Sequence, residues 1–155
     1  MGAEDLHVPQ APDFARRVAD SFARQGAMAT IGARLARVAP GEVEIELDFQ
    51  ENLTQQDGFV HGGIIAAILD SACGYAAYSL MPPDAAVLTV EYKVNFLLPA
   101  RGERFRARGA VVKTGQTLSV CTGEAYAVDA RGEKLIATMT ATMITARGRG
   151  DVPGG

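Results

Sequence analysis

The stretch from Gly58 to Pro83 constrains the fold of this chain more than any other. Its sequence, GFVHGGIIAAILDSACGYAAYSLMPP, holds one acid, Asp70, and one histidine, His61, among apolar, small and hydroxyl-bearing residues. A run of about 20 such residues is too long for a strand and predicts a helix that is buried on most sides. Burying an unpaired carboxylate is costly, so Asp70 is either satisfied by a structural partner or kept for chemistry.

Alternating sequences on both sides of this helix predict antiparallel strands. Before it, a first strand is expected from about 29 to 38, and residues 43–49 alternate apolar with acidic side chains. Pro82 and Pro83 end the helix. Four more alternating segments then follow, at 88–96, 104–113, 117–128 and 134–145. Near the N-terminus, Asp13 is expected to cap a short helix that carries Phe14, Val18 and Phe22.

The pattern predicts one domain of the α+β class. We expect a flexible N-terminus at 1–10, a single domain at 11–146 and a Gly-rich, disordered tail at 147–155. Because the helix is apolar nearly all round, a sheet of five or six strands is expected to curl around it, with a partner subunit covering the rest.

Composition argues against several classes of partner. A net charge of −3 and a pI of about 5.4 provide no global basic surface for nucleic acid. The first residues lack the pattern of a signal peptide, and Asp70 at the helix centre disfavours a membrane span. We therefore expect a cytoplasmic protein without membrane contact. Two isolated cysteines and only two histidines predict neither a disulfide scaffold nor a metal site.

The segment NLTQQDGFVHGGIIAAILDSACG resembles a known signature: an Asn or Gln, then HGG, then an Asp on the same helix. This is the pattern of hotdog-fold acyl-CoA thioesterases of the phenylacetate-pathway (PaaI-like) type. The resemblance runs from about Val43 to Thr145 and includes the NFLLPA and KTGQTL stretches. It implies a hotdog fold and an enzyme that hydrolyses an acyl- or aryl-acyl-CoA to the free acid and coenzyme A, needing no cofactor beyond the coenzyme A of the substrate.

Helix geometry adds a prediction about assembly. Gly62 and Gly63 open the helix, where N–H groups lack partners and would polarise a thioester carbonyl. Asp70 would then act as general base on water or attack directly as nucleophile. Gly62 and Asp70 are eight residues apart, about 12 Å along a helix, which one aspartate side chain cannot span. We therefore expect them to meet across the interface of at least a dimer, with a tetramer left open.

Three further residues, Gln55, Thr89 and His61, complete the predicted catalytic group of Asp70 and Gly62, the first two through the resemblance. Gln55 stands where relatives commonly have an Asn that helps to hold the carbonyl or the water. Thr89 matches a hydroxyl residue that orients the water or the acid. His61 is interpreted as fixing the loop at the helix start rather than as an acid or base. The alternatives left open are a structural role for Asp70 and a loop hydrogen bond for Gln55.

Binding of the substrate is expected at two stretches that cradle coenzyme A in relatives. With Gly63, the predicted residues are Leu97, Leu98, Pro99, Ala100, Arg101, Lys113, Thr114, Gly115, Gln116 and Thr117. Their surroundings are basic, through Arg101, Lys113 and the row Arg104, Arg106 and Arg108, which suits a phosphate-bearing ligand unless that row is a solvated strand face.

The identity of the acyl group is not apparent from the sequence. Its pocket is expected from Cys73, Gly74, Ala77 and Tyr78, together with the partner's loop. Two other functions stay open at this point: a hotdog enoyl-CoA hydratase or dehydratase, and an acyl-CoA-binding protein without hydrolysis.

Overall fold

The computed structural model describes residues 7–148. The predicted flexible start and disordered tail lie largely outside this range. The elements are α1 (Phe14–Ala23), α2 (Gly26–Ile31), β1 (Arg34–Ala39), β2 (Glu42–Asp48), the short 3-10 helix η2 (Glu51–Leu53), α3 (Gly62–Tyr78), β3 (Ala85–Phe96), β4 (Arg104–Thr114), β5 (Leu118–Asp129) and β6 (Gly132–Arg147). None of the described helices is long and apolar enough to cross a membrane.

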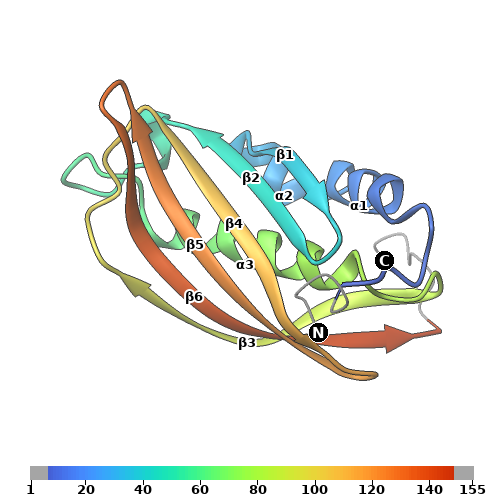
Figure 1. The fold of residues 1–155 in the computed structure, drawn as a ribbon. Coiled ribbons are helices and arrows are strands. Elements are labelled where there is room, and N and C mark those ends of the chain that lie inside the picture. The colour runs from blue at the N-terminus through green and yellow to red at the C-terminus, as the bar shows by residue number, and fades with distance from the viewer. Residues whose placement is uncertain (1–6, 149–155) are drawn as a thin grey trace.

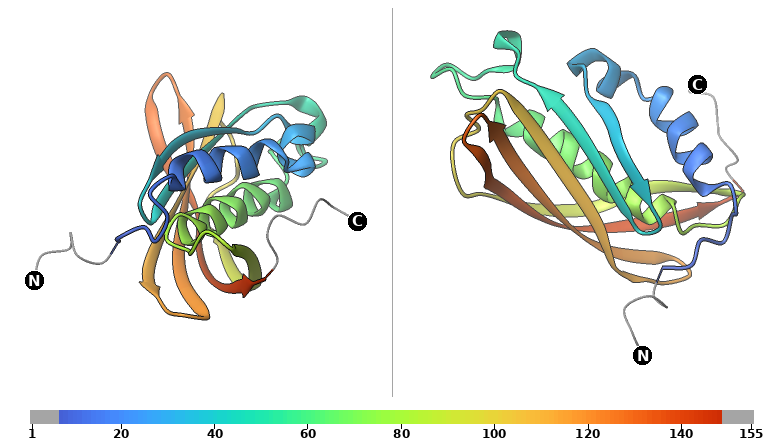
Figure 2. Two further views of the ribbon diagram at one scale, coloured as in Figure 1. Left: turned by 90° about the vertical axis from the view of Figure 1, so that its right-hand side faces the viewer. Right: turned by 45° about the horizontal axis from the view of Figure 1, so that its top comes forward.

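Six strands form one antiparallel sheet in the order β1-β2-β4-β5-β6-β3. The sheet curves around α3, as Figure 1 shows, and α1 lies alongside α3 in the views of Figure 2. This is the α+β hotdog architecture that the sequence predicts, and it confirms the fold class.

Two glycines let α3 approach the sheet closely. Gly109 of β4 and Gly123 of β5 lie directly opposite each other in the ladder. A Cβ atom on Gly109 would lie 2.3 Å from the carbonyl carbon of Ala72, and one on Gly123 would lie 3.0 Å from the Cys73 sulfur. The apolar side of α3 is thereby pressed onto β4 and β5, and Asp70 lies where α3 meets the edge strand β3.

The N-terminal region differs from the prediction in two details. Residues 29–31 belong to α2, which ends at Gly32 with a left-handed φ of 75°, so the first strand begins only at Arg34. The helical ending that glycine favours overrides the strand pattern here. Asp13 occupies the N-cap position of α1 without a capping bond, because its carboxylate pairs with Arg16 instead.

Strand β3 contains an irregularity that simple alternation does not predict. Its register with β6 shifts between Thr89 and Glu91, so Val90 forms a β-bulge. Beyond the bulge, Tyr92 pairs with the buried Ala141 and faces the helix. Because a bulge inserts one residue, Thr89 faces the helix as well.

Candidate active site

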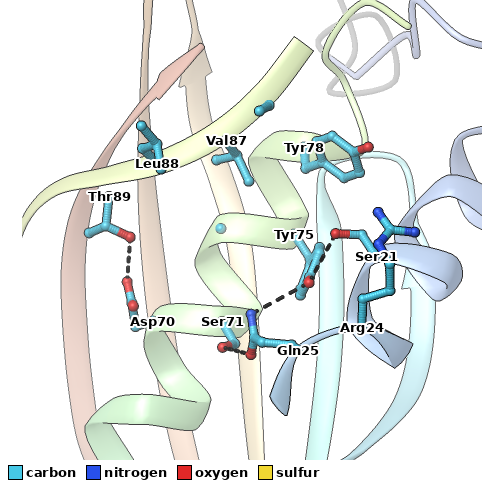
Figure 3. A pocket seen from close by; sticks show the side chains of 12 residues that line it. Ser21, Arg24, Gln25, Asp70, Ser71, Tyr75, Tyr78, Val87, Leu88 and Thr89 are labelled. Atoms are coloured by element: carbon cyan, nitrogen blue, oxygen red, sulfur yellow. Dashed lines mark hydrogen bonds between the residues drawn. The ribbon is translucent and has the colours of Figure 1, made fainter. Parts of the chain in front are cut away.

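Asp70 lies halfway along α3 and is half-buried. Its Oδ1 accepts a 2.8 Å hydrogen bond from the Thr89 hydroxyl on β3, as Figure 3 shows. Within residues 7–148 no basic side chain forms an ion pair with Asp70, and Oδ2 has no hydrogen-bond partner. A carboxylate that is held by one donor and left with a free oxygen is suited to accept a proton or to attack an electrophile.

Asp70 and Thr89 lie at the edge of a pocket of about 410 Å³ between the α1–α2 junction, α3 and β3. Its lining residues are Ser21, Arg24, Gln25, Asp70, Ser71, Gly74, Tyr75, Tyr78, Ala86, Val87, Leu88 and Thr89. Two of the residues predicted for the acyl pocket, Gly74 and Tyr78, are among them. The prediction is wrong for Cys73 and Ala77, which face the core and are 0% and 1% exposed.

The start of α3 leaves one backbone donor without a partner. His61 is the N-cap residue, and its Nδ1 accepts the N–H of Gly63 at 2.8 Å. The N–H groups of Ile64 and Ile65 donate to the His61 carbonyl. Among the described residues, the Gly62 N–H has no acceptor. The structure thus gives His61 the loop-fixing contact that we expected, occupies Gly63, and leaves Gly62 able to donate to a substrate carbonyl.

Gly62 and Asp70 are not brought together within one subunit. They stand at the start and the middle of the same helix, and Gly62 does not line the Asp70 pocket. A Cβ on Gly62 would instead meet the ring of Phe96 at 3.1 Å. The separation of about 12 Å therefore holds in the folded chain.

Gln55 lies in the loop before α3, where its side chain holds the loop. Its Oε1 accepts the N–H of Asp57 at 2.6 Å and of Phe59 at 3.3 Å, while Nε2 lies 3.5 Å from Asp57 Oδ2. Gln55 does not line the Asp70 pocket. Two roles were left open for Gln55, a site residue and a residue that holds the loop. Within one subunit it makes the hydrogen bonds of the second role.

The two stretches predicted to bind coenzyme A lie at opposite ends of β4. Ala100, in the first stretch, accepts the N–H of Val60, and Arg101 stacks on the Phe59 ring at 5.3 Å, both beside the start of α3. The second stretch forms the hairpin between β4 and β5. There, residues 114–116 line a separate pocket of about 400 Å³ with residues 80–82, which follow α3. One subunit does not combine the two stretches into a single groove.

The basic row on β4 is neutralised by acids on neighbouring strands. Arg106 lies 3.2 Å from Glu44 and 2.6 Å from Glu133, and Arg108 lies 2.6 Å from Glu42. The hydrogen bond from Arg108 holds the pKa of Glu42 below its usual range, with Arg37 contributing further. With Arg104, which lies 4.0 Å from Glu46, the row is a paired strand face. It is not the phosphate site that the local excess of basic residues suggested.

Neither cysteine has the environment of a nucleophile. Both side chains are fully buried, and the Cys121 thiol contacts the Cys73 carbonyl at 3.5 Å. Burial raises the pKa of Cys73 far above its usual value and that of Cys121 to about 12. Both side chains therefore serve as small core residues.

Sequence reasoning missed the polar residues of the pocket. Ser71 and Tyr75 lie within the helix that the sequence predicts. Ser21 lies in the last turn of α1, and Gln25 lies just after that helix. The available signal was helical spacing: Asp70 and Gly74 are four residues apart, as are Ser71 and Tyr75, so the members of each pair lie close together on α3.

A curved antiparallel sheet around a long helix that starts at His-Gly-Gly defines the hotdog class of proteins. The family model of the thioesterase superfamily matches residues 57–134. A protein of Halobacterium salinarum that carries an esterase name is 33% identical over 115 residues, which cover 71% of this chain and 76% of that protein. The chain belongs to the thioesterase superfamily, and it is a thioester hydrolase.

Solved structures and a further relative agree with this assignment. A thioesterase family protein from Silicibacter pomeroyi is 58% identical with a TM-score of 0.86, covering 87% of this chain and 99% of that one. The Escherichia coli PaaI protein shares the fold, with a TM-score of 0.76 and 18% identity over 87% of this chain and 95% of that one. A medium/long-chain acyl-CoA thioesterase of Escherichia coli is 29% identical over 96 residues, 54% of this chain and 60% of that protein.

Proposed function

We propose that the protein hydrolyses an acyl- or aryl-acyl-CoA thioester to the free acid and coenzyme A. The observation that carries this proposal is Asp70, a carboxylate with one hydroxyl partner and no ion pair within residues 7–148, placed at the edge of a 410 Å³ pocket. The acyl-CoA thioesterase of Escherichia coli supports the choice of coenzyme A as the thiol.

In the proposed mechanism the thioester carbonyl oxygen accepts the Gly62 N–H. The positive end of the α3 dipole stabilises the oxyanion of the tetrahedral intermediate. Asp70 removes a proton from water as the water oxygen bonds to the carbonyl carbon. The C–S bond then breaks, and the proton passes to the departing thiolate. Direct attack by the carboxylate is the alternative, giving an anhydride that water hydrolyses.

The complete site is proposed to need two subunits. Strand β3 forms one edge of the sheet, and its apolar side chains are exposed: Leu88 51%, Val90 55%, Tyr92 44% and Phe96 53%. A long apolar edge strand is a template for pairing with a second chain. Pairing about a two-fold axis would set two α3 helices antiparallel, so that Asp70 of each subunit faces the Gly62 end of the other.

The same arrangement provides a path for coenzyme A. Within residues 7–148 neither Arg101 nor Lys113 forms an ion pair, and roughly 40 Å of strand separates them in one subunit. Antiparallel subunits place one end of each sheet beside the opposite end of its partner. The 97–101 turn of one subunit and the 113–117 hairpin of the other would then border one groove.

A panel of short, medium, long and aromatic acyl-CoAs with a thiol reagent tests the function. Turnover of at least one class is expected, and Asp70→Asn should lower kcat by roughly 10²–10⁴, the contribution of a positioned base. Near-normal turnover by Asp70→Asn would show that Asp70 is structural. Sedimentation at micromolar concentration tests the assembly, because a monomer would rule out the two-subunit site.

An enoyl-CoA hydration assay and a measurement of acyl-CoA binding separate the two other functions. Hydration of an enoyl-CoA without thiol release would indicate a hydratase, which pairs a catalytic His with an acid. His61 argues against this, because its Nδ1 is committed to Gly63 at the helix start. Tight binding of acyl-CoA without turnover would indicate a binding protein. The unpaired oxygen of Asp70 argues against this function.

A further inference from the structure

Arg101 is held over an aromatic ring while its N–H groups have no protein acceptor. Its guanidinium carbon lies 5.3 Å from the centre of the Phe59 ring, within the range of a cation–π contact. Arg101 is exposed, and within residues 7–148 its guanidinium forms neither an ion pair nor a hydrogen bond. A guanidinium carries five N–H donors. Those of Arg101 are therefore available to a ligand.

The two other cation–π pairs of the described chain differ in this respect. Arg17, over the Tyr78 ring, also donates to backbone carbonyls that follow α3. Arg106, over the Tyr126 ring, also forms ion pairs with two glutamates on other strands. In both pairs, acceptors from the protein use the N–H groups of the guanidinium. Arg101 has the ring without these acceptors, which suits a cation that receives an anion from outside the chain.

The Phe59 ring belongs to a loop that backbone hydrogen bonds hold in place. The Gln55 N–H donates to the Phe59 carbonyl at 2.8 Å, and Gln55 Oε1 accepts the Phe59 N–H at 3.3 Å. The next residue, Val60, is buried and donates to the Ala100 carbonyl at 3.1 Å. This bond joins the loop to the turn that carries Arg101, at the end of the molecule where α3 begins (Figure 1). The ring thus limits the positions that the long Arg101 side chain can take.

We propose that Phe59 is a positioning residue that holds Arg101 ready for a phosphate of coenzyme A. This inference rests on the acyl-CoA hydrolysis proposed above. A side chain that is already restrained loses less rotamer freedom when it binds a ligand. Guanidinium and phosphate can then form two parallel hydrogen bonds. Phe59 precedes Gly62 by three residues, at most about 10 Å of chain, and the pantetheine arm of coenzyme A can span such a separation.

The test compares an acyl-CoA from the panel with the pantetheine thioester of the same acid, which lacks every phosphate. Phe59→Leu should raise KM for the acyl-CoA about two- to fivefold, the value of an exposed cation–π contact. Its kcat should not change, because a remote phosphate contact is the same in the ground and transition states. Its kinetics with the pantetheine thioester should equal those of the wild type. Phe59→Tyr keeps a ring and should retain the wild-type KM.

Two further variants separate the positioning role from a structural one. Arg101→Gln should raise KM for the acyl-CoA at least as much as Phe59→Leu. The double variant should be no worse than Arg101→Gln alone, because Phe59 acts through Arg101. Phe49→Leu is the matched control: this ring is 42% exposed and has no cation contact in the described chain, so KM should not change. Calorimetric titration with free coenzyme A should rank the variants in the same order without any turnover.

The outcomes distinguish this inference from the function on which it rests. If no acyl-CoA is hydrolysed, the proposed function fails, and the titration with coenzyme A still tests Phe59. If the wild type has the same KM for the acyl-CoA and the pantetheine thioester, hydrolysis stands and the phosphate contact is overturned. An unchanged KM of Phe59→Leu for the acyl-CoA would overturn the positioning role. A loss of kcat with both substrates would also overturn it, since the ring would then only hold the loop before α3.

Discussion

The Thr89 hydroxyl reaches the Asp70 carboxylate across 2.8 Å because β3 bulges at the next residue. Strict alternation from Tyr92 would turn Thr89 to the outer face of the sheet. The bulge adds one residue and returns Thr89 to the helix side. Bulges are frequent beside active sites, where they redirect a side chain. We therefore propose Thr89 as a positioning residue for Asp70.

Replacing Thr89 should affect turnover more than substrate binding. Thr89→Val keeps the shape but removes the donor, so the carboxylate loses its orientation, and kcat should fall about tenfold, as for one hydrogen bond to a charged group. KM should change little. Thr89→Ser restores a hydroxyl and should recover most of the loss. Equal kinetics for the Val and Ser variants would show that the hydroxyl has no part in the reaction.

Two glycines that sequence does not distinguish should respond oppositely to alanine. Gly109→Ala would place a Cβ 2.3 Å from the backbone of Ala72, so α3 must move, at a cost of about 1–3 kcal/mol or more. The Cβ atom of Gly74→Ala would have no neighbour within 4 Å, so this substitution should raise the free energy of unfolding by up to about 1 kcal/mol. Urea unfolding measures both. The Gly74 variant should also lose kcat/KM for bulky acyl groups, and a stable variant with unchanged kinetics would remove Gly74 from the acyl pocket.

Most of the fold was predictable because its signals are local. Alternation placed all strands after α3, and the two prolines marked the end of the helix region. The exceptions depend on tertiary context. Gly32 ends α2 where the sequence also suited a strand, and the bulge at Val90 appears only in the pairing of β3 with β6.

The site was predictable only in part. Asp70 stood out as an acid within an apolar helix, and the HGG motif marked Gly62. The pairing of Arg106 and Arg108 with Glu44 and Glu42 was not apparent, because the partners are some sixty residues apart in sequence and meet only through strand register. For the same reason, the contribution of α1 to the pocket required the fold.

The Glu42–Arg108 pair gives stability a predictable dependence on pH. Because the folded pKa of Glu42 lies below its unfolded value, its contribution is fully present above the unfolded pKa, about 4.3. The contribution is lost as the pH falls through the folded pKa. Glu42→Gln should therefore be less stable than the wild type at pH 7, by up to about 1 kcal/mol. This difference should shrink on acidification.

Urea unfolding at pH 7 and below pH 4 measures this effect. Glu51→Gln is the matched control, since Glu51 is exposed and forms no ion pair within the described residues. Its free energy of unfolding should match that of the wild type at both pH values. If Glu42→Gln remains less stable than the wild type by the same amount in acid, this loss of stability has a cause other than the ionised pair.

Both cysteines should be unreactive in the native protein. Cys73 and Cys121 are each 0% exposed, and burial raises the pKa of both thiols. A disulfide reagent at pH 8 should therefore release almost no chromophore until guanidinium unfolds the chain, when two thiols react. Rapid labelling of the folded protein would mean that α3 separates readily from the sheet.

Mixed dimers test whether Asp70 and Gly62 act from different subunits. Gly62→Pro removes the free N–H at a position where proline is tolerated, the first residue of a helix. The preceding His61 already has φ −58° and ψ 134°, the region that a residue before proline prefers. The new Cβ would lie 3.1 Å from Cζ of Phe96, the far end of a flexible side chain, so a small shift of the ring accommodates it.

Asp70→Asn and Gly62→Pro should each be nearly inactive alone and regain activity when refolded together. In a mixed dimer, one site combines the intact Asp70 of one chain with the intact Gly62 of the other, while the second site carries both defects. With random pairing, half of the dimers have one working site of two, so the mixture should reach about a quarter of wild-type activity. Circular dichroism and sedimentation first establish that each variant folds and dimerises. A mixture that stays as inactive as its components would place both groups in one subunit, against the 12 Å that α3 sets between them.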